Sequence, residues 1–193
     1  MLADLRRAAA LLLLVACRVP LAAEFGLTDL MQSFAVVPEA HARFAEVRRS
    51  DVLRAPIEQS GTLYYQRPDL LERRVSSPYQ ATTRIEAGRV TIDNPARGQP
   101  QSYSLAALPA ALALIEGLRA TLAGDLVALE QHYRVTLEGG RAAWTLHLAP
   151  RDPALAGAVA GVRLVGSAAR IARVEIEETT GDRVTMLLSD HQP

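Results

Sequence analysis

The sequence predicts an α+β protein in which antiparallel strands are interrupted by helices. Apolar and polar residues alternate in several short segments between residues 42 and 93, as expected for strands with one buried face. A leucine- and alanine-rich segment, residues 105–132, then repeats its leucines at helical spacing, and the alternation resumes after it. This order of strands, helices and strands in 193 residues indicates one domain.

The first expected element is a short helix that Thr28 caps, with Leu30 and Phe34 on one face. The strands that follow are expected in the segments HARFAEVR, IEQSGTLYYQ, LLERRV, ATTRIE and RVTID. Turn-forming groups such as Ala-Pro, Arg-Pro-Asp, Ser-Ser-Pro and Ala-Gly separate these segments. The pattern therefore predicts a meander of short antiparallel strands.

Two helices are expected after NPARGQPQS, residues 94–102, which breaks the strand pattern. The apolar residues at helical spacing in the first helix are Leu108, Leu112, Ile115, Leu118 and Leu122. Gly124 is a natural stop for this helix, and Asp125 can cap a second one that carries Leu126, Leu129 and Tyr133. The two helices together interrupt the sheet.

Strands are expected again in YRVTLEGG, RAAWTLHLAP, GVRLVG, RIARVEIEETTGD and RVTMLLSD. Composition predicts hairpin turns at residues 138–141 and 180–182, because both contain glycine between polar residues. No repeat or linker divides residues 24–193, so they are expected to form one domain.

The N-terminus is typical of a secretory signal peptide, expected to span residues 1–23. Arg6 and Arg7 precede the run Ala8–Ala16, which is far shorter than the ~20 residues that span a bilayer. One cleavage alternative is PLAA, before Glu24. The other is LVAC, which has the form of a bacterial lipobox and would make a lipidated Cys17 the first residue. Both alternatives predict export.

The composition argues against several classes of function. The 21 basic and 21 acidic side chains cancel, so no net charge attracts nucleic acid. The four histidines are scattered without metal-ligand spacing, and the sequence has no nucleophile elbow, dinucleotide fingerprint or P-loop. We therefore expect no enzyme, no cofactor and no metal, and local, largely apolar binding.

The segment Gly61–Arg74 leaves two readings of the sheet open. Its buried face is expected to carry Leu63 and Tyr65, and strand parity places Arg67 on the same side. In one reading the helices pack permanently on a filled core. In the other they are a lid over an apolar cavity, and Arg67 binds the unpaired carbonyls at a helix end, because a buried guanidinium needs several acceptors.

Several motifs resemble the outer-membrane lipoprotein carrier protein LolA and its relatives. The matching motifs are F-x-E at Phe44–Glu46, G-x-L-x-Y-x-R-P-D-L-L at Gly61–Leu71, Pro78, I-x-x-G-R-V at Ile85–Val90, the helical insert and the late strands. The resemblance covers the chain after Ala23. The polar stretch Ile92–Pro95 and the alanine-rich insert are more similar to divergent relatives found with polyene-pigment and lipid biosynthesis genes.

The resemblance implies an incomplete, strongly curved antiparallel β-barrel, a half-barrel, with a helical lid. It implies a periplasmic carrier that receives acylated cargo, a lipoprotein or another lipid, from an inner-membrane donor and passes it to an outer-membrane acceptor. The chain is expected to be a monomer. The expected cavity residues are Phe44, Leu63, Tyr65, Leu71, Leu112, Ile115, Leu118 and Trp144, and the expected lid latch is Arg67. The alternatives are an acceptor anchored to the outer membrane through Cys17 and a structural domain with a filled core.

Overall fold

A computed structural model describes residues 25–107 and 109–192 of the chain. The expected signal peptide, both of its cleavage sites and Cys17 lie outside these residues, as does Leu108 of the helical insert. Within the described part, no helix is long and apolar enough to cross a membrane.

The described residues form one antiparallel sheet of eleven strands. In chain order the strands are β1 (Glu39–Arg49), β2 (Ile57–Gln66), β3 (Leu70–Ser77), β4 (Ala81–Glu86), β5 (Arg89–Asp93), β6 (Gln101–Ser104), β7 (Tyr133–Gly140), β8 (Ala143–Pro150), β9 (Val159–Ser167), β10 (Arg170–Glu178) and β11 (Arg183–Gln192). In space they follow the order β6-β5-β4-β3-β2-β1-β11-β10-β9-β8-β7. The sheet is open, because β6 and β7 form its two edges and do not pair with each other.

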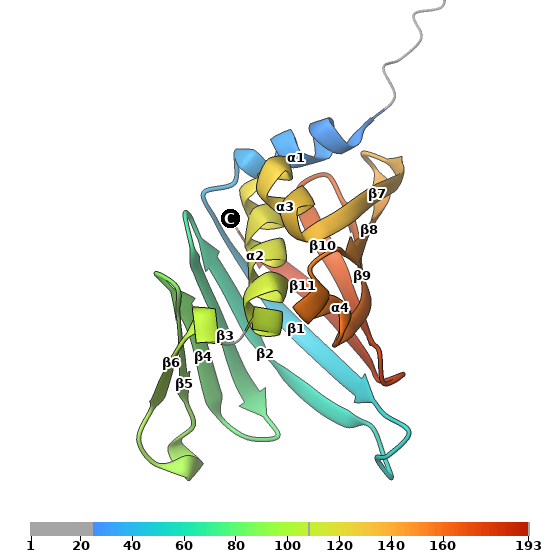
Figure 1. Ribbon diagram of the computed structural model, residues 1–193. Helices are drawn as coiled ribbons and strands as arrows, with labels where there is room; N and C mark the ends of the chain where they lie inside the picture. The colour runs from blue at the N-terminus through green and yellow to red at the C-terminus, as the bar shows by residue number, and fades with distance from the viewer. Residues whose placement is uncertain (1–24, 108, 193) are drawn as a thin grey trace, which may run out of the picture.

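One long-range pairing joins the early and late strands. β1 lies between its hairpin partner β2 and the last strand, β11, and Phe44 is opposite both Gly61 and Leu188. All other neighbouring strands are consecutive in the chain. The sheet therefore consists of two meanders, β1–β6 and β7–β11, that meet at the β1–β11 pair. Figure 1 shows how it curves around the helices. The predicted α+β half-barrel is confirmed.

The helices gather on the concave side of the sheet (Figure 1). They are α1 (Leu27–Ala35), α2 (Pro109–Ala123), α3 (Leu126–His132) and α4 (Pro153–Ala156), with short 3-10 turns η1 (Pro95–Arg97) and η2 (Leu105–Ala107). The main backbone neighbours of α2 are α1, α3, α4 and η2 rather than strands. Because the backbone of α2 packs mainly on other helices, only side chains of α2 meet the sheet.

Local chemistry places the break between α2 and α3 where the sequence predicts it. Gly124 has a φ of +68° and follows the last residue of α2, and the Asp125 carboxylate accepts a hydrogen bond from the backbone N–H of Ala128. A Cβ on Gly124 would lie 2.2 Å from the carbonyl oxygen of Met31 in α1. Glycine therefore both ends α2 and lets α1 approach it.

Three details differ from the sequence prediction. Gly26 rather than Thr28 is the N-cap of α1, and its backbone N–H donates to the Asp29 carboxylate. The first hairpin turn of the second meander falls on residues 141–142, because the strand pairing continues through Gly140 and Ala143. The segment expected only to break the pattern also contains the first two residues of β6, which extends the sheet beyond β5. Such edge strands lack an apolar alternation that would identify them.

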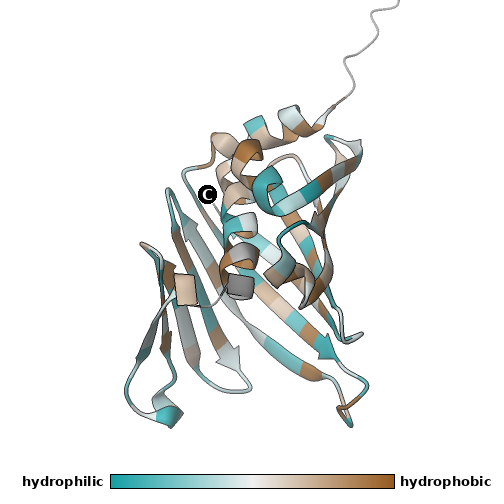
Figure 2. Cartoon of the chain, in the orientation of Figure 1, coloured by the Kyte–Doolittle hydropathy of each residue, from teal (hydrophilic) through white to brown (hydrophobic). Residues whose placement is uncertain are grey.

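The filled core lies at one end of the molecule, beneath α1, α3 and α4. Phe34 of α1 meets the Trp144 ring edge-on, with the two ring centres 5.9 Å apart. The Trp144 indole N–H donates to the carbonyl of Ala168. The core cluster draws its buried members from the helices and from β7–β10. Figure 2 shows polar and apolar residues mixed along the strands, as expected where one face is solvated. The β2–β4 wing lies outside this cluster and faces α2 across a cavity.

Candidate functional site

An apolar cavity of about 310 Å³ lies between α2 and the concave face of the sheet. Its lining residues are Leu63, Tyr64, Leu71, Glu72, Arg73, Thr83, Ile85, Leu114, Ile115, Leu118, Leu122, Tyr133, Leu148, Val162, Leu164, Ile171, Val174, Ile176, Met186 and Leu188. The list draws on both meanders, so the cavity exists only because the sheet curves and α2 crosses its opening.

The side of α2 that faces the cavity is a regular apolar stripe. Leu114, Leu118 and Leu122 follow one another at intervals of four residues, and Ile115 lies beside them, so they share one helical face. Gly117 lies close to the Tyr133 ring, where an added Cβ would come within 2.2 Å of a ring carbon. A glycine at this position lets α2 rest directly on Tyr133.

The sheet side of the cavity consists of cross-strand neighbours. Leu71 of β3 is opposite Ile85 of β4, and Leu63 of β2 is opposite Arg73 of β3. Arg73 is in turn opposite Thr83, so these two side chains interrupt an otherwise apolar row. Directly opposite residues in an antiparallel pair share a face, which explains why this row is continuous.

The structure brings four of the expected cavity residues together and leaves four outside. Leu63, Leu71, Ile115 and Leu118 line the cavity. The expected residues that do not line it are Phe44, Tyr65, Leu112 and Trp144. Trp144 is fully buried in the filled core, because β8 passes beneath α1 at that point. Phe44 and Tyr65 are buried, and Leu112 is half-buried. Strand parity identified the inner face but not the depth of each side chain.

Sequence reasoning missed the second meander's contribution and the polar part of the lining. The alternation in RIARVEIEE and RVTMLLSD already indicated that Val174, Ile176, Met186 and Leu188 share inner faces. Arg73 gave no such signal, because the run LLERRV contains consecutive polar residues and only the strand register shows which of them faces inward.

Arg67 connects three segments at the end of β2. Its Nε donates to the carbonyl of Val37 at 3.1 Å, and its Nη2 donates to the carbonyl of Ala123, the last residue of α2, at 2.6 Å. Its backbone N–H also donates to the carbonyl of Pro38 at 2.9 Å. The Arg67 side chain is exposed rather than buried in an apolar interior, because β2 ends one residue earlier. A cation at a helix C-terminus is electrostatically favourable.

Two buried tyrosines flank the cavity. Burial raises the pKa of Tyr133 to about 12, and the nearby Asp152 carboxylate adds to this effect. Burial also raises the pKa of Tyr65, against an opposing effect of Arg67 and Arg119. The Tyr65 hydroxyl has no hydrogen-bond partner among the described residues. Both phenols are therefore neutral at physiological pH.

Other hollows in the structure are less suited to an apolar ligand. A larger one, of about 710 Å³, includes His147, Arg163 and Glu175, which share a face of β8–β10 opposite to the cavity. A smaller one, of about 280 Å³, adjoins the cavity at Ile85 and Ile115 and contains the Glu116–Arg119 ion pair. Among the described residues, no group of three His, Cys, Asp or Glu side chains could hold a metal ion.

Comparisons with known proteins show to which family the chain belongs. A family described as outer membrane lipoprotein carrier protein LolA-like matches residues 21–191. Two similar solved structures are a LolA superfamily protein from Nitrosomonas europaea, and a putative outer membrane lipoprotein-sorting protein domain from Vibrio parahaemolyticus. The first is 11% identical, covers 86% of this chain and 91% of that chain, and has a TM-score of 0.49. The second is 12% identical, covers 86% and 90%, and has a TM-score of 0.45. The comparison with curated proteins gave no match. Since the family match spans nearly the whole sequence, the chain belongs to the outer membrane lipoprotein carrier protein LolA-like family.

Proposed function

We propose that this protein is a lipid carrier that holds an acyl chain in the cavity beneath α2 and passes it to a membrane acceptor. The observation that carries the proposal is the cavity itself. Its lining is mostly aliphatic, and residues from α2 and both meanders surround it. Such a site suits a ligand that binds mainly by burial of apolar surface rather than by hydrogen bonds or ion pairs.

The energetics of acyl binding require a lid that opens at low cost. Each buried methylene contributes ~0.8 kcal/mol, so a long chain supplies roughly 10 kcal/mol before ordering costs are subtracted. A carrier must also release this ligand. The bonds from Arg67 to the carbonyls of Val37 and Ala123 are few and exposed, so water can replace them when α2 moves. We propose that Arg67 is the latch that closes α2 after release.

The proposed place of action is the periplasm, because the N-terminal 23 residues have the character of a signal peptide. In this proposal the mature chain begins near Glu24 and moves between an inner-membrane donor and an outer-membrane acceptor. The alternative is an outer-membrane-anchored acceptor whose first residue is an acylated Cys17. Mass determination of the mature N-terminus separates the two: an unmodified start near Glu24 supports the carrier, and an acylated Cys17 supports the anchored acceptor.

The cavity is tested by filling it. Thr83 of β4 lines the cavity, whereas its neighbour Thr82 is opposite Arg74 and Asp93 on the other face of the strand. Thr83→Trp should weaken saturable binding of an apolar fluorescent dye at least about tenfold, since the indole occupies the ligand's space. Thr82→Trp is the matched control and should bind the dye like the wild type. Absence of dye binding by the wild-type protein would instead favour the filled-core domain.

A further inference from the structure

Arg73 places a positive charge in the wall of the apolar cavity. Two charged residues contribute to the lining, but Glu72 lies on the opposite face of β3, where it pairs with Arg74 and Arg84. Arg73 lies on the inner face between Leu63 and Thr83. It is therefore the charged side chain that a ligand in the cavity would meet.

The contacts of Arg73 use one edge of its guanidinium group. Its Nη2 donates to Gln59 Oε1 at 2.7 Å and to Glu46 Oε2 at 3.2 Å, and its Cζ lies 4.6 Å from the centre of the Phe44 ring. Nε and Nη1 have no hydrogen-bond partner among the described residues. A guanidinium carries five N–H donors, so most of the Arg73 donors are free.

The environment makes these free donors significant. The Arg73 side chain is 28% exposed and that of Glu46 is 17% exposed, so the pair is largely withdrawn from water. A half-buried ion pair contributes little to stability compared with apolar residues of the same size. The free nitrogens of Arg73 are not among the fully buried unpartnered atoms, so a ligand head group can reach them. A few polar groups that converge on an apolar pocket are what orient a bound ligand.

We infer that Arg73 is a head-group site for an amphiphile with one acyl chain and a carboxylate head, such as a long-chain fatty acid. This inference rests on the proposed lipid-binding function of the cavity. The cavity volume of about 310 Å³ is at the lower end of the roughly 300–1,000 Å³ typical of ligand pockets, which favours a single chain. The planar guanidinium matches the geometry of a carboxylate. Glu46 competes for the same cation, which limits the affinity and permits release.

The test compares palmitic acid with hexadecanol, which has the same chain and a neutral head. Each ligand is titrated against an apolar dye bound to the full mature chain at pH 8.5, and its affinity is measured from the displacement of the dye. The wild type should bind the acid more tightly than the alcohol. Arg73→Gln should lower the affinity for the acid roughly ten- to a hundredfold, the effect of losing a charged hydrogen bond, and leave the alcohol unchanged. Glu46→Gln should raise the affinity for the acid, because Arg73 then lacks a competing anion.

Arg74→Gln is the matched control, because Arg74 is the next residue of β3 and pairs with Glu72 on the outer face. It should change neither affinity. Arg73→Lys retains the charge and should keep part of the preference, which separates charge from packing. Equal binding of acid and alcohol by the wild type, or an Arg73→Gln variant that weakens both alike, would overturn the head-group site while the cavity proposal stands. Failure of the dye to bind at all would overturn the proposed function instead.

Discussion

At the scale of single residues, Arg67 and Arg73 differ in what surrounds them. Arg67 lies in solvent and its partners are backbone carbonyls at the ends of two segments, so its bonds can break and re-form without burying a charge. Arg73 is half-buried and its partners are side chains of β1 and β2. The first arrangement suits a moving contact, and the second suits a fixed one.

Replacement of Arg67 by leucine should affect transfer more than folding. Because water can satisfy the exposed carbonyls of Val37 and Ala123, we expect a loss of at most about 1 kcal/mol in unfolding free energy. Dye affinity should persist, while the rate of hand-over to acceptor vesicles should fall, since α2 no longer gains the Arg67 bonds on closing. Arg43→Leu is the control, because Arg43 is exposed and has one ion pair, to Asp190.

The same Arg67→Leu preparation shows whether Arg67 closes the lid, as a latch, or only holds a loop in place, as a tether. Melting temperature, dye affinity and transfer rate are measured together. A larger loss of stability, with binding and transfer reduced in parallel, would identify Arg67 as a tether. A variant that transfers lipid at the wild-type rate would show that Arg67 has no part in the transfer mechanism.

The buried phenol of Tyr133 predicts a change of stability at high pH. Burial raises its pKa from 10 to about 12 in the folded state. Because the folded pKa is the higher one, this contribution to stability is complete below pH 10 and is lost as the pH rises towards 12. Absorbance titration of tyrosinate should show a phenol that ionises near pH 12, and this phenol should be absent in Tyr133→Phe. Titration of all tyrosines near pH 10 in the folded protein would contradict the burial.

At the scale of elements, α2 is fixed by glycines at two points and by side chains elsewhere. Gly124 ends the helix against α1, and Gly117 seats its middle on Tyr133. Between the helix and the concave face of the sheet there is instead the cavity, which both meanders line. The helix therefore packs closely on Tyr133 and α1 at these two glycines, and its apolar face meets the sheet through the side chains that line the cavity.

Gly117→Ala should destabilise the protein even though alanine is the better helix former. Alanine gains about 1 kcal/mol in a free helix, but its Cβ would overlap the Tyr133 ring, and such overpacking costs typically 1–3 kcal/mol. Urea unfolding measures the difference. Gly140→Ala is the control, because an added Cβ there meets nothing within 4 Å. Replacement of Tyr133 by leucine should restore part of the loss, and an unchanged midpoint for Gly117→Ala would show that α2 is not seated on this ring.

At the scale of the whole molecule, the sequence predicts local elements better than the site. The strand IEQSGTLYYQ has its observed ends, Ile57 and Gln66, because its alternation is bounded by prolines at 56 and 68. The helix break at Gly124 likewise follows from local chemistry. Which inner-face residues line the cavity depends on the β1–β11 pairing, which joins residues far apart in the chain. The sequence therefore predicts Trp144 and Leu118 alike as cavity residues, although only Leu118 lines the cavity.

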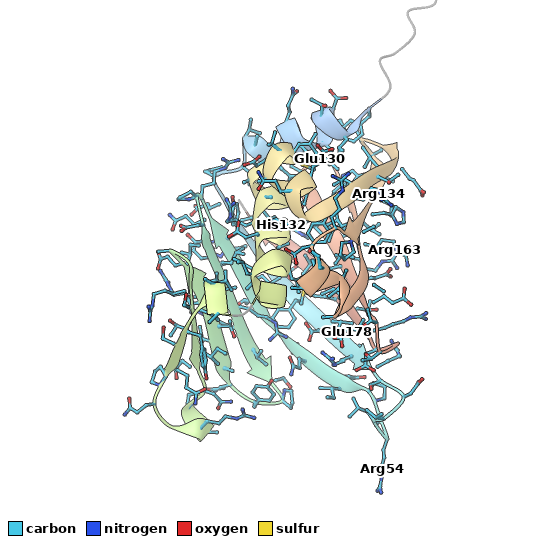
Figure 3. The ribbon with its side chains drawn as sticks, in the orientation of Figure 1. Arg54, Glu130, His132, Arg134, Arg163 and Glu178 are labelled. Atoms are coloured by element: carbon cyan, nitrogen blue, oxygen red, sulfur yellow. The ribbon has the colours of Figure 1, made fainter. Side chains whose placement is uncertain are left out.

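The two-meander arrangement also explains why one molecule contains both a filled core and a cavity. The β7–β11 side packs against α1, α3 and α4, whereas the β2–β4 wing reaches α2 only through cavity-lining side chains. At the far end, the β1–β2 hairpin extends away from the helices, and Arg54 points outward from its tip (Figure 3). The core cluster and the cavity share residues such as Leu148, Val162 and Leu164, so the cavity lies against the filled core.

The position of a bound acyl chain tests the central claim most directly. The measurement is intermolecular nuclear Overhauser contacts between unlabelled palmitic acid and the isotope-labelled methyl groups of the mature chain. We expect contacts from the acyl methylenes to Ile85, Ile115 and Leu71, and none to Leu129 or Leu155 of the filled core. Contacts confined to exposed side chains such as Val52, or saturable binding without contacts to Ile85 and Ile115, would contradict the account.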